Sequence, residues 1–213
     1  MAKIFPSLEN IERLKVPPTP GEIALATSLA QRLSDDYEIF FQPFLNGDMP
    51  DIILMRRGAG VAIIEVKDWN LSSYSVVDKN QWRERAGNHV VRSPFKQVFG
   101  YKSNMFNLHI NGLAEKNALN NNFYGIIKPF VYFHESTKED VNELYYPAES
   151  SLKQARDELN QKFRNREITH PAYEKRLEYL DQKLRQIGRD KGISIFPNDL
   201  SKITDCLKQE HVL

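Results

Sequence analysis

The spacing of apolar residues changes along the chain and divides it into predicted helices and strands. In "TPGEIALATSLAQRLSDD", apolar residues recur every three or four positions, which predicts a helix over 19–36 with a proline in its first turn and acidic residues at its end. The prolines of "KVPPTP" disfavour any helix before Pro20. "YEIFFQPFL" is typical of a strand and "NGDMP" of a turn.

Two apolar runs, "DIILMRR" and "GVAIIEVKD", flank a short turn and predict a β-hairpin around 58–60. Three shorter runs, "SYSVV", "QWRER" and "HVVRS", predict a meander of strands. A second helix is predicted to begin at Pro94, capped by Ser93, and to run through "PFKQVFGYKSNMFNLHINGLA". "YGIIKPFVYFHE" predicts a buried strand, in which Pro129 indicates a bulge or an edge position.

The pattern becomes purely helical from Ser150 onward. Apolar residues repeat at three- and four-residue spacing on both sides of the break "ITHP", which predicts two antiparallel helices over 150–190. "GISIFPNDLSKITDCLKQE" then predicts a short strand and a closing helix. We therefore expect an α/β core over 1–149, with a mixed central sheet flanked by helices, a helical hairpin over 150–190, and a return to the core over 191–213.

Composition limits the classes of function. With 213 residues, 41% hydrophobic and 27% charged, the chain is long enough for a substantial core, and its apolar runs are too short to span a bilayer. Its single cysteine, Cys206, excludes an internal disulfide framework, so we expect a cytoplasmic protein in which this residue is a small buried apolar group. The net charge of +1 argues against strong nonspecific nucleic-acid binding, although residues 150–191 hold eleven Lys and Arg against seven Asp and Glu.

Three charged residues stand at the outer ends of the predicted hairpin. Alternation along a strand places Glu65 and Lys67 on the same face. If residues 58–60 form a three-residue loop, Arg57 pairs with Val61, and counting outward places Asp51 opposite Lys67 with Glu65 as its diagonal neighbour. The spacing therefore predicts that two carboxylates and an ammonium group converge within about 5 to 8 Å.

Such a set suits hydrolysis of a phosphodiester. Mg²⁺ or Mn²⁺ takes oxygen ligands, so Asp51 and Glu65, with the carbonyl of Val66 as a further ligand, could hold the ion beside a phosphate. A bound ion lowers the pKa of its water, and Lys67 could orient that water or stabilise developing negative charge. The alternative remains open, because strands often end in charged residues and a cross-strand pair of Asp and Lys is common.

The order of these motifs resembles the PD-(D/E)xK nuclease superfamily. "PD" at 50–51 is followed by "EVK" at 65–67, and together with "PGE" at 20–22 and "SPFKQVFGYKSN" at 93–104 the pattern resembles the nuclease-related domain, NERD, over about residues 18–135. The resemblance implies a restriction-endonuclease-like core, a Mg²⁺ or Mn²⁺ cofactor and DNA as substrate. It also implies a helicase or another DNA-processing domain or subunit as a candidate partner.

The resemblance also implies a role for each matching residue. Glu22 corresponds to an acidic residue on the first helix that assists the metal site, Asp51 and Glu65 to the metal-binding carboxylates, and Lys67 to the catalytic lysine. Gln97 and Tyr101 correspond to a QxxxY element beside the site, and we assign Tyr101 and its neighbour Lys102 to substrate binding and Gln97 to the catalytic set. Helix geometry agrees with the pairing of Gln97 and Tyr101, because residues four apart share one helix face.

Other interpretations of these residues stay open. Glu22 is also the third helical residue after Thr19, the arrangement of a capping box. Gln97 could be a solvated helix residue and Tyr101 a packing residue. For the whole protein, the alternatives to a nuclease are a catalytically inactive nucleic-acid-binding or recruitment module, and an oligomerisation domain built on the helices of 150–190. That hairpin could be a packing cover, a dimer seam, a docking arm or a DNA-contacting surface.

Overall fold

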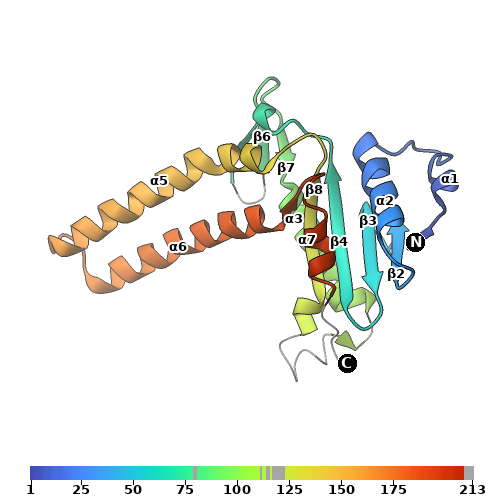
Figure 1. Ribbon diagram of the computed structural model, residues 1–213. Coiled ribbons are helices and arrows are strands. Elements are labelled where there is room, and N and C mark those ends of the chain that lie inside the picture. Colours follow the sequence, from blue (N-terminus) through green and yellow to red (C-terminus); the bar gives the residue numbers. More distant parts are fainter. Residues whose placement is uncertain (79–80, 111, 114–115, 117–122, 209–213) are drawn as a thin grey trace.

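In a computed structural model that describes residues 1–78, 81–110, 112–113, 116 and 123–208, the chain forms a mixed six-stranded sheet packed with helices (Figure 1). The strands, in their order across the sheet, are β1 (Lys3–Phe5), β2 (Tyr37–Phe41), β3 (Ile52–Arg56), β4 (Gly60–Lys67), β8 (Ile127–Phe133) and β9 (Ser194–Ile195). Strand β3 pairs antiparallel with both β2 and β4, whereas β1 pairs parallel with β2, and β4, β8 and β9 pair in parallel. The predicted α/β class and mixed sheet are confirmed.

The register of the β3–β4 hairpin differs from the prediction. Arg56 pairs with Gly60 and Ile52 with Ile64, so the loop consists of residues 57–59 rather than 58–60. Gly58 supplies the positive φ of +77° that this loop requires. The pairing of Arg57 with Val61 is therefore wrong, and extending the observed register by one residue places Asp51 opposite Glu65 rather than Lys67.

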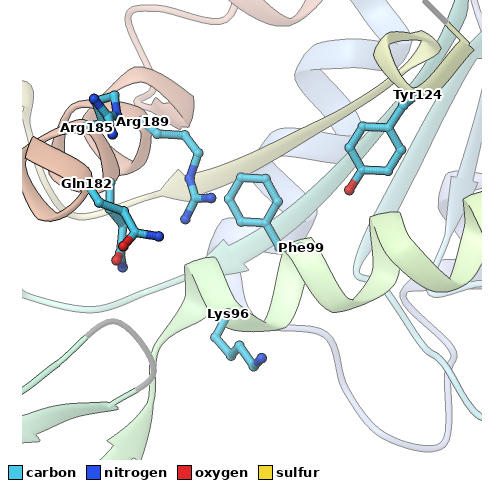
Figure 2. Close-up of a pocket in the computed structure, with 7 residues that line it drawn as sticks. Lys96, Phe99, Tyr124, Gln182, Arg185 and Arg189 are labelled. Carbon is cyan, nitrogen blue, oxygen red and sulfur yellow. The ribbon is translucent and has the colours of Figure 1, made fainter. Parts of the chain in front are cut away.

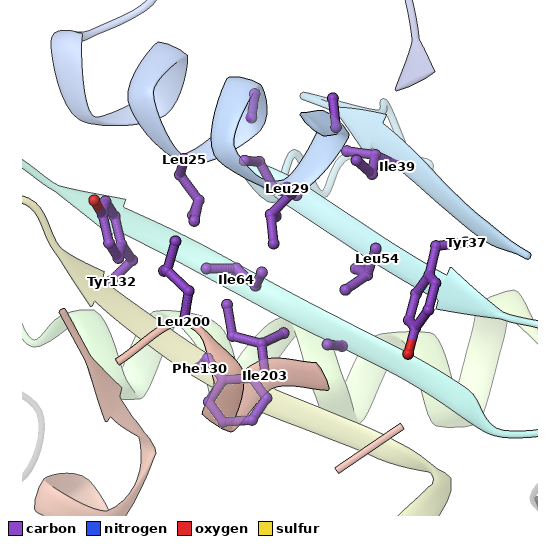
Figure 3. Close-up of a cluster of buried hydrophobic side chains, with 14 of the residues drawn as sticks. Leu25, Leu29, Tyr37, Ile39, Leu54, Ile64, Phe130, Tyr132, Leu200 and Ile203 are labelled. Carbon is purple, nitrogen blue, oxygen red and sulfur yellow. The ribbon is translucent and has the colours of Figure 1, made fainter. Parts of the chain in front are cut away.

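Each face of the sheet carries its own hydrophobic core. On one face lie α2 (Pro20–Arg32) and α7 (Ser201–Asp205), whose Leu25, Leu29 and Ile203 pack over Leu54 and Ile64 of the sheet (Figure 3). The opposite face is covered by α3 (Pro94–Asn104) and the first turns of α5 (Lys138–Arg164). Because side chains alternate along β4, Glu65 and Lys67 belong to the α3 face and Val66 to the α2 face.

The predicted meander is present as a small second sheet of β5 (Tyr74–Val76), β6 (Gln81–Glu84) and β7 (Val90–Arg92). Trp82 of β6 is buried in the core under α3, which ties this sheet to the main one. The short connecting helices are η1 (Leu71–Ser73), η2 (Met105–His109, a π-helical turn that continues α3) and η3 (Phe123–Ile126). In β8, Pro129 comes before Val131 and Tyr132, the two residues that pair with β9. At Pro129 the outer side of the strand therefore has no partner in β9.

The helices α5 and α6 (His170–Ile193) pack against each other and extend side by side away from the sheet (Figure 1). The predicted start of the first of these helices at Ser150 is wrong, because α5 begins at Lys138. The first turns of α5 bury Val141 and Leu144 in the core between the sheet and α3, whereas its later turns pack against α6. The apolar residues of the first turns therefore do not belong to the apolar stripe from which the hairpin was predicted. The domain boundaries at 149 and 190 stay a prediction.

At the N-terminus, the expectation that no helix precedes Pro20 is wrong, because Leu8–Ile11 form the single-turn helix α1. The prolines that suggested it, from Pro17 onward, all follow this turn and place no restriction on it. None of the helices in the described part of the chain is long and apolar enough to cross a membrane. Cys206 is half-buried beside the α2-side core, and burial raises the pKa of its thiol to about 11.

Candidate metal and phosphodiester site

Asp51, Glu65 and Lys67 meet where β4 ends and β3 begins. Glu65 is 1% exposed, and one of its carboxylate oxygens, Oε1, lies 2.5 Å from the Lys67 ammonium nitrogen. The carboxylate of Asp51 accepts a hydrogen bond of 2.6 Å from the amide of Val66, the residue between the other two. The three groups predicted to converge are thus brought together. The strand register differs from the predicted one by two residues, and a shift of two residues leaves every side chain on the same face of the sheet.

Because the carboxyl groups of Asp51 and Glu65 are buried, nearby charges affect their pKa values. Burial, together with the charge of Glu65, raises the pKa of Asp51 to about 8. Burial also raises the pKa of Glu65, although the ammonium of Lys67 opposes the shift. The side chain of Lys67 is 18% exposed and reaches solvent, so the pair is accessible from the lysine side.

The oxygen atoms at this point suit a hard divalent cation. Glu65 Oε2 is buried and has no hydrogen-bond partner among the described residues, which leaves a desolvated acceptor without compensation. Because the amide of Val66 faces Asp51, strand geometry directs its carbonyl to the same side. Two carboxylates and a carbonyl match the oxygen ligands that Mg²⁺ or Mn²⁺ takes, with water completing the shell.

A complete three-residue cage is not preformed. In the chain as described, which omits 79–80, 111, 114–115, 117–122 and 209–213, no group of three or more His, Cys, Asp or Glu side chains is arranged to hold a metal ion. Mg²⁺ is commonly bound through one or two carboxylates together with substrate phosphate oxygens. The residues therefore fit a two-carboxylate site that substrate would complete.

Glu22 lies at the start of α2 and fulfils the capping role. Its Oε2 accepts from the amide of Thr19 at 2.7 Å, and the amide of Glu22 donates to the Thr19 hydroxyl, which makes a full capping box. Its Oε1 accepts from the side-chain amide of Gln42 at 3.0 Å. The negative charge of Glu22 also contributes to the raised pKa of Asp51 and of Glu65, so the capping residue acts on the acidic pair electrostatically.

Two residues that place α2 against the site escaped the sequence analysis. Asp68, directly after Lys67, accepts a 3.0 Å hydrogen bond from the amide of Gly21 and so satisfies a free amide in the first turn of the helix. Gln42 holds the Glu22 carboxylate, and its own amide donates to the Asp51 carbonyl at 2.8 Å. The position of Asp68 beside "EVK" was a weak signal in the sequence, whereas Gln42 gave none.

The predicted QxxxY element connects α3 to the segment that carries Asp51. Gln97 donates to the Tyr101 hydroxyl at 3.0 Å, and that hydroxyl donates to the carbonyl of Met49, two residues before Asp51, at 3.3 Å. Burial is the main cause of the raised pKa of Tyr101, to which Glu65 and Asp51 also contribute. Asn104, one turn further along, donates to Asp48 at 2.9 Å, so a residue that the sequence analysis missed also holds this loop.

Lys102 lies on a different side of α3. Its ammonium group is 3.9 Å from the centre of the Tyr124 ring, and burial together with the nearby charge of Lys128 lowers its pKa to about 8. Its assignment to substrate binding stays a prediction. Arg92, at the end of β7, was not singled out from sequence, yet its positive charge opposes the raised pKa of Glu65.

The family described as the nuclease-related domain, NERD, matches residues 18–134, which is more than half of the chain and includes Glu22, Asp51, Glu65, Lys67 and Gln97. No curated protein and no solved structure was found that matches the chain.

Proposed function

The chain belongs to the nuclease-related domain family, and from this premise we propose that it is a metal-dependent nuclease that hydrolyses phosphodiester bonds of DNA. The observation that carries the proposal is the meeting of Asp51, Glu65 and Lys67 at the end of β4, with 2.5 Å between the Lys67 ammonium nitrogen and Glu65. Glu65 has a buried acceptor oxygen without a partner among the described residues, the feature expected of a cation ligand.

In this proposal Asp51, Glu65 and the carbonyl of Val66 are the groups that would hold Mg²⁺ or Mn²⁺. When bound, the ion would lower the pKa of a coordinated water and polarise the phosphate. Lys67, partly exposed and next to Glu65, orients the attacking water and stabilises the negative charge that develops on the phosphoryl oxygens. The water gives up a proton to solvent as a bond forms between its oxygen and phosphorus, and the bond to the leaving sugar oxygen breaks as that oxygen takes up a proton.

The surrounding residues position this machinery. Gln97 and Tyr101 fix the segment before Asp51 through the carbonyl of Met49. Glu22, held by Gln42, adds negative charge close enough to raise the pKa of both carboxylates and so to increase their attraction for a divalent cation. A helicase or other DNA-processing partner, which the family resemblance implies, remains a prediction.

A direct test incubates the purified protein with linear, nicked and single-stranded DNA in the presence of Mn²⁺ or Mg²⁺. We expect cleavage by the wild type, loss of cleavage with EDTA and in Asp51→Ala, and unchanged cleavage in Asp157→Ala, which removes an exposed aspartate of α5. Equal cleavage by the wild type and Asp51→Ala would identify a contaminant and refute the proposal.

One observation favours a second candidate, an inactive nucleic-acid-binding or recruitment module. Lys67 already neutralises Glu65 without a metal ion, and the described side chains form no three-residue metal cluster. Calorimetric titration separates the two candidates. Binding of Mg²⁺ at millimolar concentration that Asp51→Ala abolishes supports the nuclease, whereas no binding and a DNA affinity that is independent of Mg²⁺ support the module.

A further inference from the structure

A hollow with only basic, aromatic and amide side chains lies between α3 and α6, away from the carboxylates. It has a volume of about 520 Å³, within the range of sites that bind small molecules. Figure 2 shows Arg185 and Arg189 of α6 on one side, Lys96 and Phe99 of α3 on the other, and Tyr124 further along. None of its described lining side chains is acidic. Arg189 is paired at 3.3 Å with Asp190, which is not part of the lining, so the three cations that line the hollow outnumber this one neighbouring carboxylate.

Flat groups line the hollow as well as charges. The guanidinium of Arg189 lies 4.0 Å from the centre of the Phe99 ring, and Tyr124 adds a second ring, whose centre lies 3.9 Å from the ammonium nitrogen of Lys102. Guanidinium planes and aromatic rings are the platforms on which unpaired bases stack. Positive charge next to such platforms is the combination that single-stranded nucleic acid recognises, since it contacts the backbone and the bases together.

The hollow is connected to the carboxylate site by further cations. Successive residues of a helix are rotated by about 100°, so the exposed arc of α3 runs from Gln97 through Gly100 and Lys96 to Phe99. Arg92 lies over this arc, because its guanidinium is 3.5 Å from the position of a Cβ on Gly100. Arg92 and Lys96 also line one shallow depression at the edge of the small sheet.

The same cations follow one another in space from the small sheet to α6. Arg92 and Lys96 share the depression at the small sheet, Lys96 also lines the hollow, and Arg185 and Arg189 follow on α6. A helix with its side chains is about 10–12 Å across, so a single DNA strand of a few nucleotides is long enough to cross the exposed arc of α3.

We propose that the hollow between α3 and α6 binds a single-stranded DNA segment whose neighbouring nucleotides lead to the bond at Asp51 and Glu65, and that α6 thereby forms part of the substrate path. The α5–α6 hairpin lies beyond the region that the family match covers, so the α6 side of the hollow is outside that match and the α3 side is within it. The inference rests on the proposed function for the meaning of its substrate but concerns binding, which can be measured without cleavage.

The test measures fluorescence anisotropy of a short labelled single-stranded oligodeoxynucleotide with the full chain in EDTA, over a range of salt concentrations. In the triple variant K96Q/R185Q/R189Q we expect affinity to fall by at least about tenfold and the slope of log K against log salt to decrease by about 2, which is three lost phosphate contacts. The matched control K162Q/K175Q/R176Q removes three exposed cations toward the tip of the hairpin and should bind as the wild type does.

A second variant separates stacking from charge. Phe99→Leu keeps an apolar side chain in the partly buried position but removes the ring, and we expect about tenfold weaker binding of the single strand with an unchanged salt slope. Circular dichroism and thermal unfolding of every variant identify any loss of fold. Equal weakening in the tip control, or wild-type binding by K96Q/R185Q/R189Q, would overturn the inference.

These outcomes are distinct from failure of the proposed function. If the wild type binds the strand through the hollow but does not cleave it, the inference stands and the nuclease proposal fails. If cleavage depends on Asp51 but K96Q/R185Q/R189Q binds and cleaves as the wild type does, the nuclease proposal stands and the inference fails.

Discussion

Asp51 directly precedes β3, and the β3–β4 register extended by one residue places it opposite Glu65, whose charge, together with burial, raises the pKa of the Asp51 carboxyl. Such a pair costs the fold free energy unless a proton or a cation neutralises one of the charges. The ammonium of Lys67 compensates Glu65, and Asp51 is left to carry the proton at neutral pH. A divalent cation can replace that proton, which links metal binding, pH and stability.

The first prediction concerns stability and pH. Because the pKa of Asp51 is raised from 3.8 to about 8, the folded state retains a proton that the unfolded state has released, so in EDTA the free energy of unfolding falls as pH rises from about 4 to about 8. Asp51→Asn removes this loss. At pH 8 we expect its melting temperature to exceed that of the wild type by at least about 3 °C, or roughly 1 kcal/mol for a chain of this size.

The measurement is thermal unfolding from pH 5 to pH 8.5 with and without Mn²⁺. Mn²⁺ should stabilise the wild type more at high pH, where it no longer competes with the proton, and should not stabilise Asp51→Asn. Parallel pH profiles of the two proteins in EDTA would contradict the assignment of the raised pKa to Asp51.

The second prediction separates metal binding from catalysis at Lys67. Lys67→Met keeps the length of the side chain but removes the charge that contacts Glu65, so we expect Mn²⁺ still to bind while the cleavage rate falls by about 10² to 10³. Lys67→Arg keeps the positive charge and should recover part of the rate. Cleavage is followed on a labelled DNA strand and Mn²⁺ binding by calorimetry. Loss of Mn²⁺ binding in Lys67→Met together with cleavage would show that the lysine only organises Glu65.

The sequence predicted which charged residues form the site, but it did not predict the correct register of the two strands that carry them. Gly58 lies in the hairpin loop and Gly60 is the first residue of β4, but a three-residue loop fits the sequence at either 57–59 or 58–60, so counting from the glycines gave a pairing that is two residues out. The convergence of Asp51, Glu65 and Lys67 survived because side chains alternate with a period of two. Helix and strand periods likewise gave the order of the main elements but not the true start of α5, whose first turns face a different core.

The residues that support the site could not be predicted from local pattern. Gly21 and Asp68 are 47 positions apart in sequence, and Gln42 reaches Glu22 only because β2 and α2 pack against each other. Neither contact leaves a periodic or compositional trace. Arg92 similarly approaches the site from the small sheet, whose placement over α3 depends on the burial of Trp82.

The third prediction resolves the two roles of Glu22. Glu22→Gln retains an acceptor for the Thr19 amide and so keeps the capping box, while it removes the negative charge that acts on Asp51 and Glu65. We expect wild-type stability in urea unfolding but weaker Mn²⁺ affinity. Glu22→Ala should lose both the affinity and about 1 kcal/mol of stability. Wild-type Mn²⁺ affinity in Glu22→Gln would leave Glu22 with the capping role alone.

The fourth prediction concerns the close approach of α2 to the end of β4. A Cβ on Gly21 would overlap the carboxylate of Asp68 and lie 2.8 Å from the Cβ of His134, and both neighbours are held by the strands on which the site is built. Gly21→Ala must therefore push α2 away or break the bond from its amide to Asp68. We expect a loss of about 1–3 kcal/mol in urea unfolding, together with weaker Mn²⁺ binding as Glu22 moves.

The matched control is Gly188→Ala in α6, where a Cβ meets nothing within 4 Å. There the same substitution should stabilise the protein by about 0.5–1 kcal/mol, because alanine loses less backbone entropy than glycine in a helix. The two variants thus shift the urea midpoint in opposite directions if steric contact decides the outcome at Gly21. A stabilised Gly21→Ala protein with unchanged Mn²⁺ affinity would mean that α2 does not approach Asp68 this closely and that Glu22 is positioned by Gln42 without it.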